Sequence, residues 1–172
     1  MLKLAGCICI LAASSGMAYS CIRSMYGSLR ETELLAELLT AVEGELTYNR
    51  CPLPELFVHL SEHMKKPYRE LLLQMSSQME ENREADIPVL WKEACAQFHR
   101  QMNLPGEAYA ALLRVGEVFS YASLDSSLQL LAYTKKKLDA AIHKQYAEFA
   151  GKRKLYCCLC YTAGLFTIII LL

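Results

Sequence analysis

Charged residues are almost absent from both ends of this 172-residue chain and are concentrated in its middle. Residues 4–22 contain no charged side chain and are framed by Lys3 and Arg23, and residues 155–172 contain none after the basic segment 152–154. As helices, which rise 1.5 Å per residue, the two segments would extend for roughly 27–29 Å, close to the ~30 Å hydrocarbon core of a bilayer. The pattern therefore predicts one membrane-spanning helix at each end.

The region between these segments carries apolar residues at helical spacing. Ser28 and Glu31 have the spacing of a capping box, which predicts a first helix that starts at Ser28 and runs to about Asn49. Asp125 is the expected cap of a sixth helix, and the second membrane segment can continue that helix.

Prolines and a turn predict the helix boundaries between these two helices. Pro54, Pro67 and Pro88 suit the starts of a second, third and fourth helix, because a first helical turn leaves its N–H groups unpaired. Segment 103–106 (Asn-Leu-Pro-Gly) predicts a turn before the fifth helix. The residues expected on the apolar faces are Leu34, Leu35, Leu38, Leu39, Val42, Leu46, Leu56, Phe57, Leu60, Met64, Tyr68, Leu71, Leu72, Met75, Met79, Leu90, Trp91, Ala94, Cys95, Phe98, Leu112, Leu113, Gly116, Phe119, Leu128, Leu131, Leu138, Ile142 and Phe149.

Six helices joined by short breaks are typical of an antiparallel bundle. The predicted fold is all-α, with an N-terminal transmembrane helix (residues 1–23), an antiparallel six-helix bundle (24–154) and a C-terminal transmembrane helix (155–172). Basic residues stay on the cytoplasmic side of membranes, and 17 of the 18 Lys and Arg residues follow the first segment. We therefore expect the bundle in the cytoplasm and two short tails on the far side.

A cleaved signal peptide is the alternative interpretation of the N-terminal segment, because such peptides also have a basic residue followed by an apolar run. Ala18, Tyr19 and Ser20 precede Cys21 as in a cleavage or lipoprotein site, although Tyr19 fits a lipobox poorly. Cleavage would place the body outside the cytoplasm, against the charge distribution.

Charge, cysteine content and motifs exclude several classes of function. Residues 24–154 hold 16 basic and 18 acidic side chains, which is not the footprint of a nucleic-acid-binding protein. The clusters Cys7-x-Cys9 and Cys157-Cys158-x-Cys160 lie in apolar segments without His partners, and only Cys51 and Cys95 lie in the body, so the sequence indicates neither a zinc framework nor a cofactor. No GxxxxGK followed by Ser or Thr occurs, so any ATP-driven work is expected from a partner.

One motif resembles an enzyme signature. His59, Glu62 and His63 read H-x-x-E-H, the pattern of inverted zinc peptidases, in which two His ligate zinc and the Glu activates water. A third ligand would be needed, for which Glu107, Glu117 and Glu148 are the candidates. The alternative interpretation is two solvent-facing His on an amphipathic helix, and we expect no catalysis.

Several segments along the whole chain together resemble the stage III sporulation protein AB family. The segments that carry the resemblance are Met1–Leu4, Gly6, Ala13–Ser15, Glu43-x-Glu45-Leu46-x-Tyr48, Pro52–Glu55, Leu113-x-x-Gly116, Asp125, Gln129 and Gly151-Lys152-x-Lys154-Leu155-Tyr156. The family usually has a second Gly shortly after the position of Gly116, where this chain has Ser120 and Tyr121. The turn between the fifth and sixth helices is therefore expected to differ here.

The resemblance implies a non-enzymatic role in endospore formation. Proteins of this family lie in the mother-cell membrane and belong to the channel-like complex that links mother cell and forespore. Their soluble domain is similar to the cytoplasmic domain of the type II secretion platform protein. By that similarity the chain would dock a cytoplasmic secretion-type ATPase, stage III sporulation protein AA, beside other membrane proteins of the complex.

The end of the first predicted helix is the expected docking region. Glu43, Glu45 and Tyr48 lie there, at one end of the expected bundle. The alternative interpretation of the same residues is packing and helix capping. A different membrane assembly, served by the chain as an adaptor without an ATPase, is a further alternative.

Overall fold

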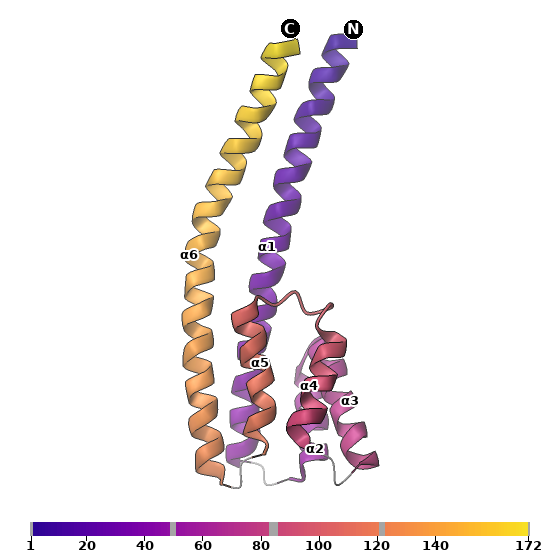
Figure 1. Ribbon diagram of the computed structural model, residues 1–172, viewed down its shortest axis with the longest axis vertical. Coiled ribbons are helices and arrows are strands. Elements are labelled where there is room, and N and C mark those ends of the chain that lie inside the picture. Colours follow the sequence, from indigo (N-terminus) through magenta and orange to yellow (C-terminus); the bar gives the residue numbers. More distant parts are fainter. Residues whose placement is uncertain (1, 49–50, 83–85, 121–122, 172) are drawn as a thin grey trace. The chain divides into compact units, whose positions relative to one another are not determined.

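The computed structural model describes residues 2–48, 51–82, 86–120 and 123–171, and toward the ends of its first and last helices it describes few side chains. All elements in the described residues are α-helices (Figure 1), which confirms the all-α prediction. The helices are α1 (Leu2–Tyr48), α2 (Leu53–His63), α3 (Tyr68–Glu81), α4 (Ile87–Phe98), α5 (Gly106–Val118) and α6 (Leu124–Leu171).

The chain divides into two compact units, and α1 and α6 contribute to both of them. Unit 1 consists of Met1–Leu29 and His143–Leu172, and unit 2 of Arg30–Ile142. Within unit 1, segments of α1 and α6 lie side by side with the two chain ends at the same end of the unit (Figure 1). The rings of Tyr26 and Phe149 meet edge to face there, with centroids 6.2 Å apart.

Unit 2 has one hydrophobic core, to which every helix contributes. Three aromatic rings lie in it: the Phe57 centroid is 6.0 Å from that of Trp91 and 4.9 Å from that of Phe119. The predicted apolar positions of α1 to α5 are buried or pack against this core, and so are Leu131, Leu138 and Ile142 of α6. Helical periodicity therefore predicted the core correctly.

The predicted start of the first helix is wrong. α1 begins at Leu2 rather than at Ser28, which lies in the interior of a helix of 47 residues. No proline precedes Ser28, and Gly27 alone costs a helix interior only about 1 kcal/mol relative to Ala. The capping-box spacing recurs inside helices, and here nothing stops the helix upstream of it.

The predicted cap of α6 is also wrong, by two positions. α6 begins at Leu124, so Asp125 lies in its first turn and is not the capping residue. Ser123 caps the helix instead, because its hydroxyl oxygen accepts a hydrogen bond from the Ser126 N–H at 3.3 Å. The acidic side chain of Asp125 still suits the positive end of the helix dipole.

The predicted starts of α2 to α5 are confirmed. Pro54 and Pro88 lie in the first turns of α2 and α4, Pro67 immediately precedes α3, and α5 starts at Gly106. α6 continues without a break to Leu171, as the sequence allowed. The turn between α5 and α6 is the one expected to differ from that of the family, and its residues 121–122 lie outside the described residues.

Residues 4–22 and most of residues 155–172, the predicted membrane segments, have a helical backbone, but many of their side chains lie outside the described residues. Across the part of the chain that the structure describes, no helix combines the length and the apolar character that crossing a bilayer requires.

Candidate functional site

The three predicted docking residues lie in the last two turns of α1, on different sides of the helix. A helix turns about 100° per residue, so Glu45 and Tyr48 lie on neighbouring faces, whereas Glu43 lies on nearly the opposite side from Glu45. Tyr48 is 86% exposed. The structure therefore places Glu45 and Tyr48 together and separates Glu43 from them.

Glu43 faces α6. Its Oε2 accepts a hydrogen bond from Lys135 Nζ at 2.5 Å, and both side chains are partly exposed. Exposed ion pairs contribute only about 0–1 kcal/mol, so this contact helps to define the packing of α1 on α6 within unit 2 more than it stabilises the fold. A docking partner at Glu43 would have to compete with Lys135.

Glu45 lies at a meeting point of three segments. Ligand atoms of Glu45, Cys51 and His59 all lie within 4.8 Å of one another. Glu45 comes from the end of α1, Cys51 from the connection to α2, and His59 from the middle of α2. We name these three residues the Glu-Cys-His cluster; Glu45 and Cys51 are half-buried, and His59 is exposed.

The two His and the Glu of the H-x-x-E-H motif are all exposed on α2. Among the described residues, His59 shares a possible metal-binding group with Glu45 and Cys51, and neither Glu62 nor His63 belongs to that group. The sequence did not single out Cys51 as a ligand, because the Glu-Cys-His spacing matches no zinc signature. The end of α1, Cys51 just before α2 and the middle of α2 bring the three together.

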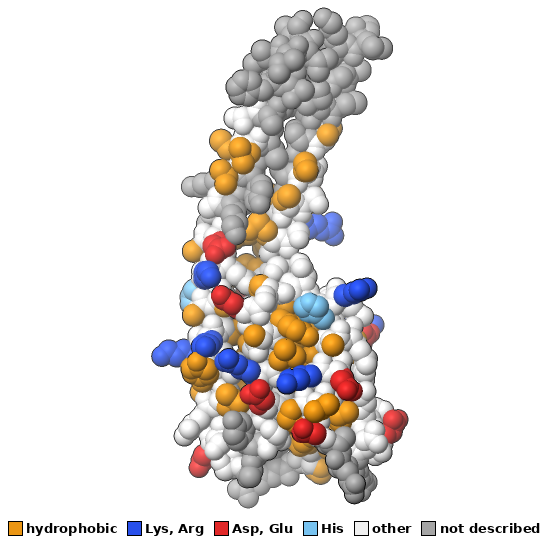
Figure 2. Space-filling model, viewed as in Figure 1, with side chains coloured by type: hydrophobic (Ala, Val, Ile, Leu, Met, Phe, Trp, Pro, Cys, Tyr) orange, Lys and Arg blue, Asp and Glu red, His pale blue; other side chains and the backbone are white. Residues whose placement is uncertain are grey.

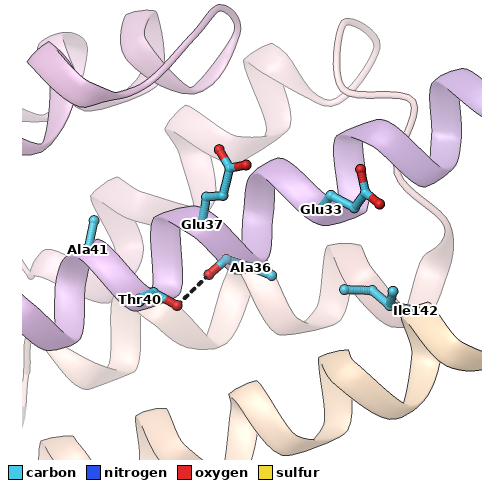
Figure 3. A pocket seen from close by; sticks show the side chains of 6 residues that line it. All are labelled: Glu33, Ala36, Glu37, Thr40, Ala41 and Ile142. Carbon is cyan, nitrogen blue, oxygen red and sulfur yellow. Dashed lines mark hydrogen bonds between the residues drawn. The ribbon is translucent and has the colours of Figure 1, made fainter.

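An open groove of about 660 Å³ lies beside α1 in unit 2, on the N-terminal side of the docking residues. Its lining residues are Glu33, Ala36, Glu37, Thr40, Ala41 and Ile142. Figure 3 shows the carboxylates of Glu33 and Glu37 projecting from the same side of α1, one turn apart. The Thr40 hydroxyl donates a hydrogen bond to the Ala36 carbonyl at 2.9 Å, so this polar group is satisfied within α1. The groove is therefore lined mainly by aliphatic carbon, beside the carboxylates of Glu33 and Glu37.

Charge on the visible surface of unit 2 is mixed (Figure 2), with acidic and basic side chains interspersed. A local basic cluster surrounds Tyr133 on α6: Lys137 Nζ lies 4.8 Å and the Arg114 guanidinium carbon 6.0 Å from the ring centroid. The hydrogen bond from Lys137, together with both cationic charges, lowers the pKa of the Tyr133 hydroxyl. Such mixed charge does not form the broad basic field that nucleic acid requires.

The second cysteine of the body, Cys95, is a core residue. It is fully buried on α4, and burial raises the pKa of its thiol to about 12. The thiol is therefore protonated at neutral pH and packs as a small apolar group, as the sequence predicted.

Family membership rests on the whole chain. The family model described as stage III sporulation protein AB matches residues 3–172. The chain therefore belongs to the stage III sporulation protein AB family. It is similar to the stage III sporulation protein AB of Bacillus subtilis (strain 168), with 21% identity over 172 residues that cover both chains completely.

A solved structure described as stage III sporulation protein AB has the same fold. Its TM-score against this chain is 0.65 at 17% sequence identity, and the match covers 72% of this chain and 97% of that chain. At that identity the likeness shows a shared fold only. Membership of the stage III sporulation protein AB family nevertheless makes this chain a sporulation protein, as the resemblance implied. The family name itself mentions no enzymatic activity.

Proposed function

We propose that this protein is a non-enzymatic platform in the mother-cell (inner) membrane, within the complex that links mother cell and forespore. In this proposal two membrane-spanning helices flank an antiparallel six-helix bundle in the cytoplasm. The observation that carries the proposal is the family match over residues 3–172. The charge-free segments at both ends and the basic residues inside them support the membrane orientation.

The bundle would dock the cytoplasmic secretion-type ATPase of the complex, stage III sporulation protein AA. The chain has no phosphate-binding motif, so a role in ATP-driven work requires such a partner. We propose the face of Glu45 and Tyr48 as the docking surface. Tyr48 is an exposed aromatic side chain at the end of α1, and tyrosine is enriched at energetically important positions of protein interfaces.

Affinity purification tests the docking. The full chain is tagged in sporulating cells, membranes are solubilised in mild detergent, and co-purifying proteins are identified. We expect the ATPase to be recovered and then lost with the double variant Glu45→Lys/Tyr48→Ala. Glu62→Lys is the matched control, because it reverses an exposed carboxylate on α2 outside this surface and should leave recovery unchanged.

Two other outcomes would change the proposal. Recovery of other membrane proteins without the ATPase would make the chain an adaptor and would overturn the docking role. Loss of the ATPase with Glu37→Lys, but not with Glu45→Lys/Tyr48→Ala, would move the docking surface to the groove on α1.

The membrane arrangement is tested separately by protease accessibility. A protease added to intact protoplasts should leave residues 24–154 uncut, and detergent lysis should expose them. Cleavage in intact protoplasts, or recovery of the chain free of membranes, would contradict the proposed orientation.

A further inference from the structure

We propose that the Glu-Cys-His cluster binds a zinc-type transition-metal ion. The proposal does not require ATPase docking, although Glu45 belongs both to the cluster and to the proposed docking surface, and it adds a metal site to a protein for which the sequence indicated none. It rests on the convergence of three different donor groups from three segments, with ligand atoms within 4.8 Å of one another.

The donor set selects the kind of metal. A cysteine thiolate, a histidine nitrogen and a carboxylate oxygen are the three ligand types that zinc uses in proteins. Magnesium and calcium take oxygen ligands, so the sulfur of Cys51 and the nitrogen of His59 argue against them. Three protein ligands also leave the fourth tetrahedral position for water or for a group from a partner.

The distances require only local adjustment. Metal–ligand bonds of about 2.0–2.3 Å in a tetrahedron separate neighbouring ligand atoms by roughly 3.5 Å. The three ligand atoms already lie within 4.8 Å, so their separations need to shrink by little more than about 1 Å. His59 is exposed and its ring is free to change rotamer without disturbing the core.

The backbone around the cluster also favours a defined site. Pro52 and Pro54 follow Cys51 closely, and the Leu56 N–H donates to the Pro52 carbonyl at 3.0 Å at the start of α2. Proline fixes its own φ angle and restricts the residue before it, so Cys51 has a limited backbone range. A bound metal would tie the end of α1 to α2 across this short connection.

Cobalt titration tests the site, because Co²⁺ replaces Zn²⁺ and is coloured. The full chain is purified in detergent under reducing conditions, stripped with a chelator and titrated with Co²⁺. We expect one ion per chain, a thiolate-to-metal absorption band in the near ultraviolet, and displacement by Zn²⁺. Zinc should also raise the Tm of the wild-type chain, because the ion binds the folded state.

Single substitutions identify the ligands. Cys51→Ser, His59→Gln and Glu45→Gln should each weaken binding by more than the roughly 10–100-fold that loss of an outer-shell partner costs. Cys51→Ser should also abolish the near-ultraviolet band. His63→Gln and Cys158→Ser are the matched controls: one removes the other histidine of α2, the other an exposed cysteine of unit 1. Both should bind as the wild type does.

Several results would overturn the proposal. They are absence of stoichiometric binding to the wild type, binding that survives Cys51→Ser, and binding that is lost with Cys158→Ser. Loss with His63→Gln, with Cys51→Ser unaffected, would assign the metal to the H-x-x-E-H motif instead. Melting curves of the metal-free variants show whether a loss of binding reflects a loss of folding.

Discussion

The core around Gly116 has no room for a side chain larger than a hydrogen atom. A Cβ added there would lie 2.7 Å from Cγ and Cδ1 of Trp91, closer than such atoms approach in real proteins. The same indole donates a buried hydrogen bond from Nε1 to the Leu112 carbonyl at 2.8 Å, so its ring cannot shift without losing that bond. The glycine thus allows α4 and α5 to pack closely.

Gly116→Ala should therefore destabilise the protein by about 1–3 kcal/mol, the usual effect of overpacking a core. Gly44→Ala is the matched control, because it lies inside α1 and a Cβ there meets no atom within 4 Å. That change should stabilise the protein by about 0.5–1 kcal/mol, since alanine favours helix. Denaturant unfolding measures both; equal effects would contradict the packing argument.

A second single residue, Glu31, gives an expected pH dependence. Burial raises the pKa of its carboxyl above the ordinary 4.5, although Arg30 partly opposes this. Its Oε2 is buried without a hydrogen-bond partner. A carboxyl with a higher pKa in the folded state binds its proton more tightly when folded, so stability is lost as pH rises through the folded pKa.

Glu31→Gln should consequently raise Tm at neutral pH, and the difference from wild type should disappear below pH 4.5, the ordinary pKa of the carboxyl. Thermal unfolding of both proteins across this pH range measures the effect. Glu62→Gln, at an exposed carboxylate, serves as the control and should show no such trend. A Tm difference that is constant with pH would refute the role of burial.

At the level of the helices, a helix start was predicted correctly where proline marks it and wrongly where only a polar residue marks it. Pro54 and Pro88 fix φ and lack an N–H, so they restrict where α2 and α4 can start. Serine and aspartate are compatible with caps, first turns and exposed interior positions alike. Ser28 and Asp125 were misassigned for that reason, since neighbouring residues decide which role applies.

The start of α6 provides the corresponding test. Ser123→Ala should destabilise unit 2 by about 1 kcal/mol, because it removes the acceptor of the Ser126 N–H. Asp125→Asn should cost less, about 0.3–1 kcal/mol, since it only removes a charge near the helix N-terminus. Urea unfolding measures the change in unfolding free energy for both variants. A larger loss for Asp125→Asn than for Ser123→Ala would restore the capping role that the sequence indicated for Asp125.

The candidate site was only partly predictable. The sequence placed Glu45 and Tyr48 at the end of a helix, where the structure has them. It could not show that Glu43 pairs with Lys135, or that Cys51 and His59 approach Glu45. These contacts join residues far apart along the chain or across a turn, and local patterns carry no information on such distances.

At the level of the whole molecule, unit 2 should be able to fold by itself. Residues 30–142 contain a single core that draws on every helix. Expressed alone, they should purify without detergent, show a helical circular dichroism spectrum and unfold in one cooperative transition. Aggregation, or gradual melting without a transition, would show that unit 2 depends on the remainder of the chain.

Trp91 gives the core its own optical signal. It is the single tryptophan of the chain, it is fully buried, and it contacts the rings of Phe57 and Phe119. Its fluorescence, excited at the red edge where tyrosine does not absorb, comes from one place between α4 and α5. An emission shift on partner or zinc binding would therefore reveal that the event reaches the core, without any attached dye.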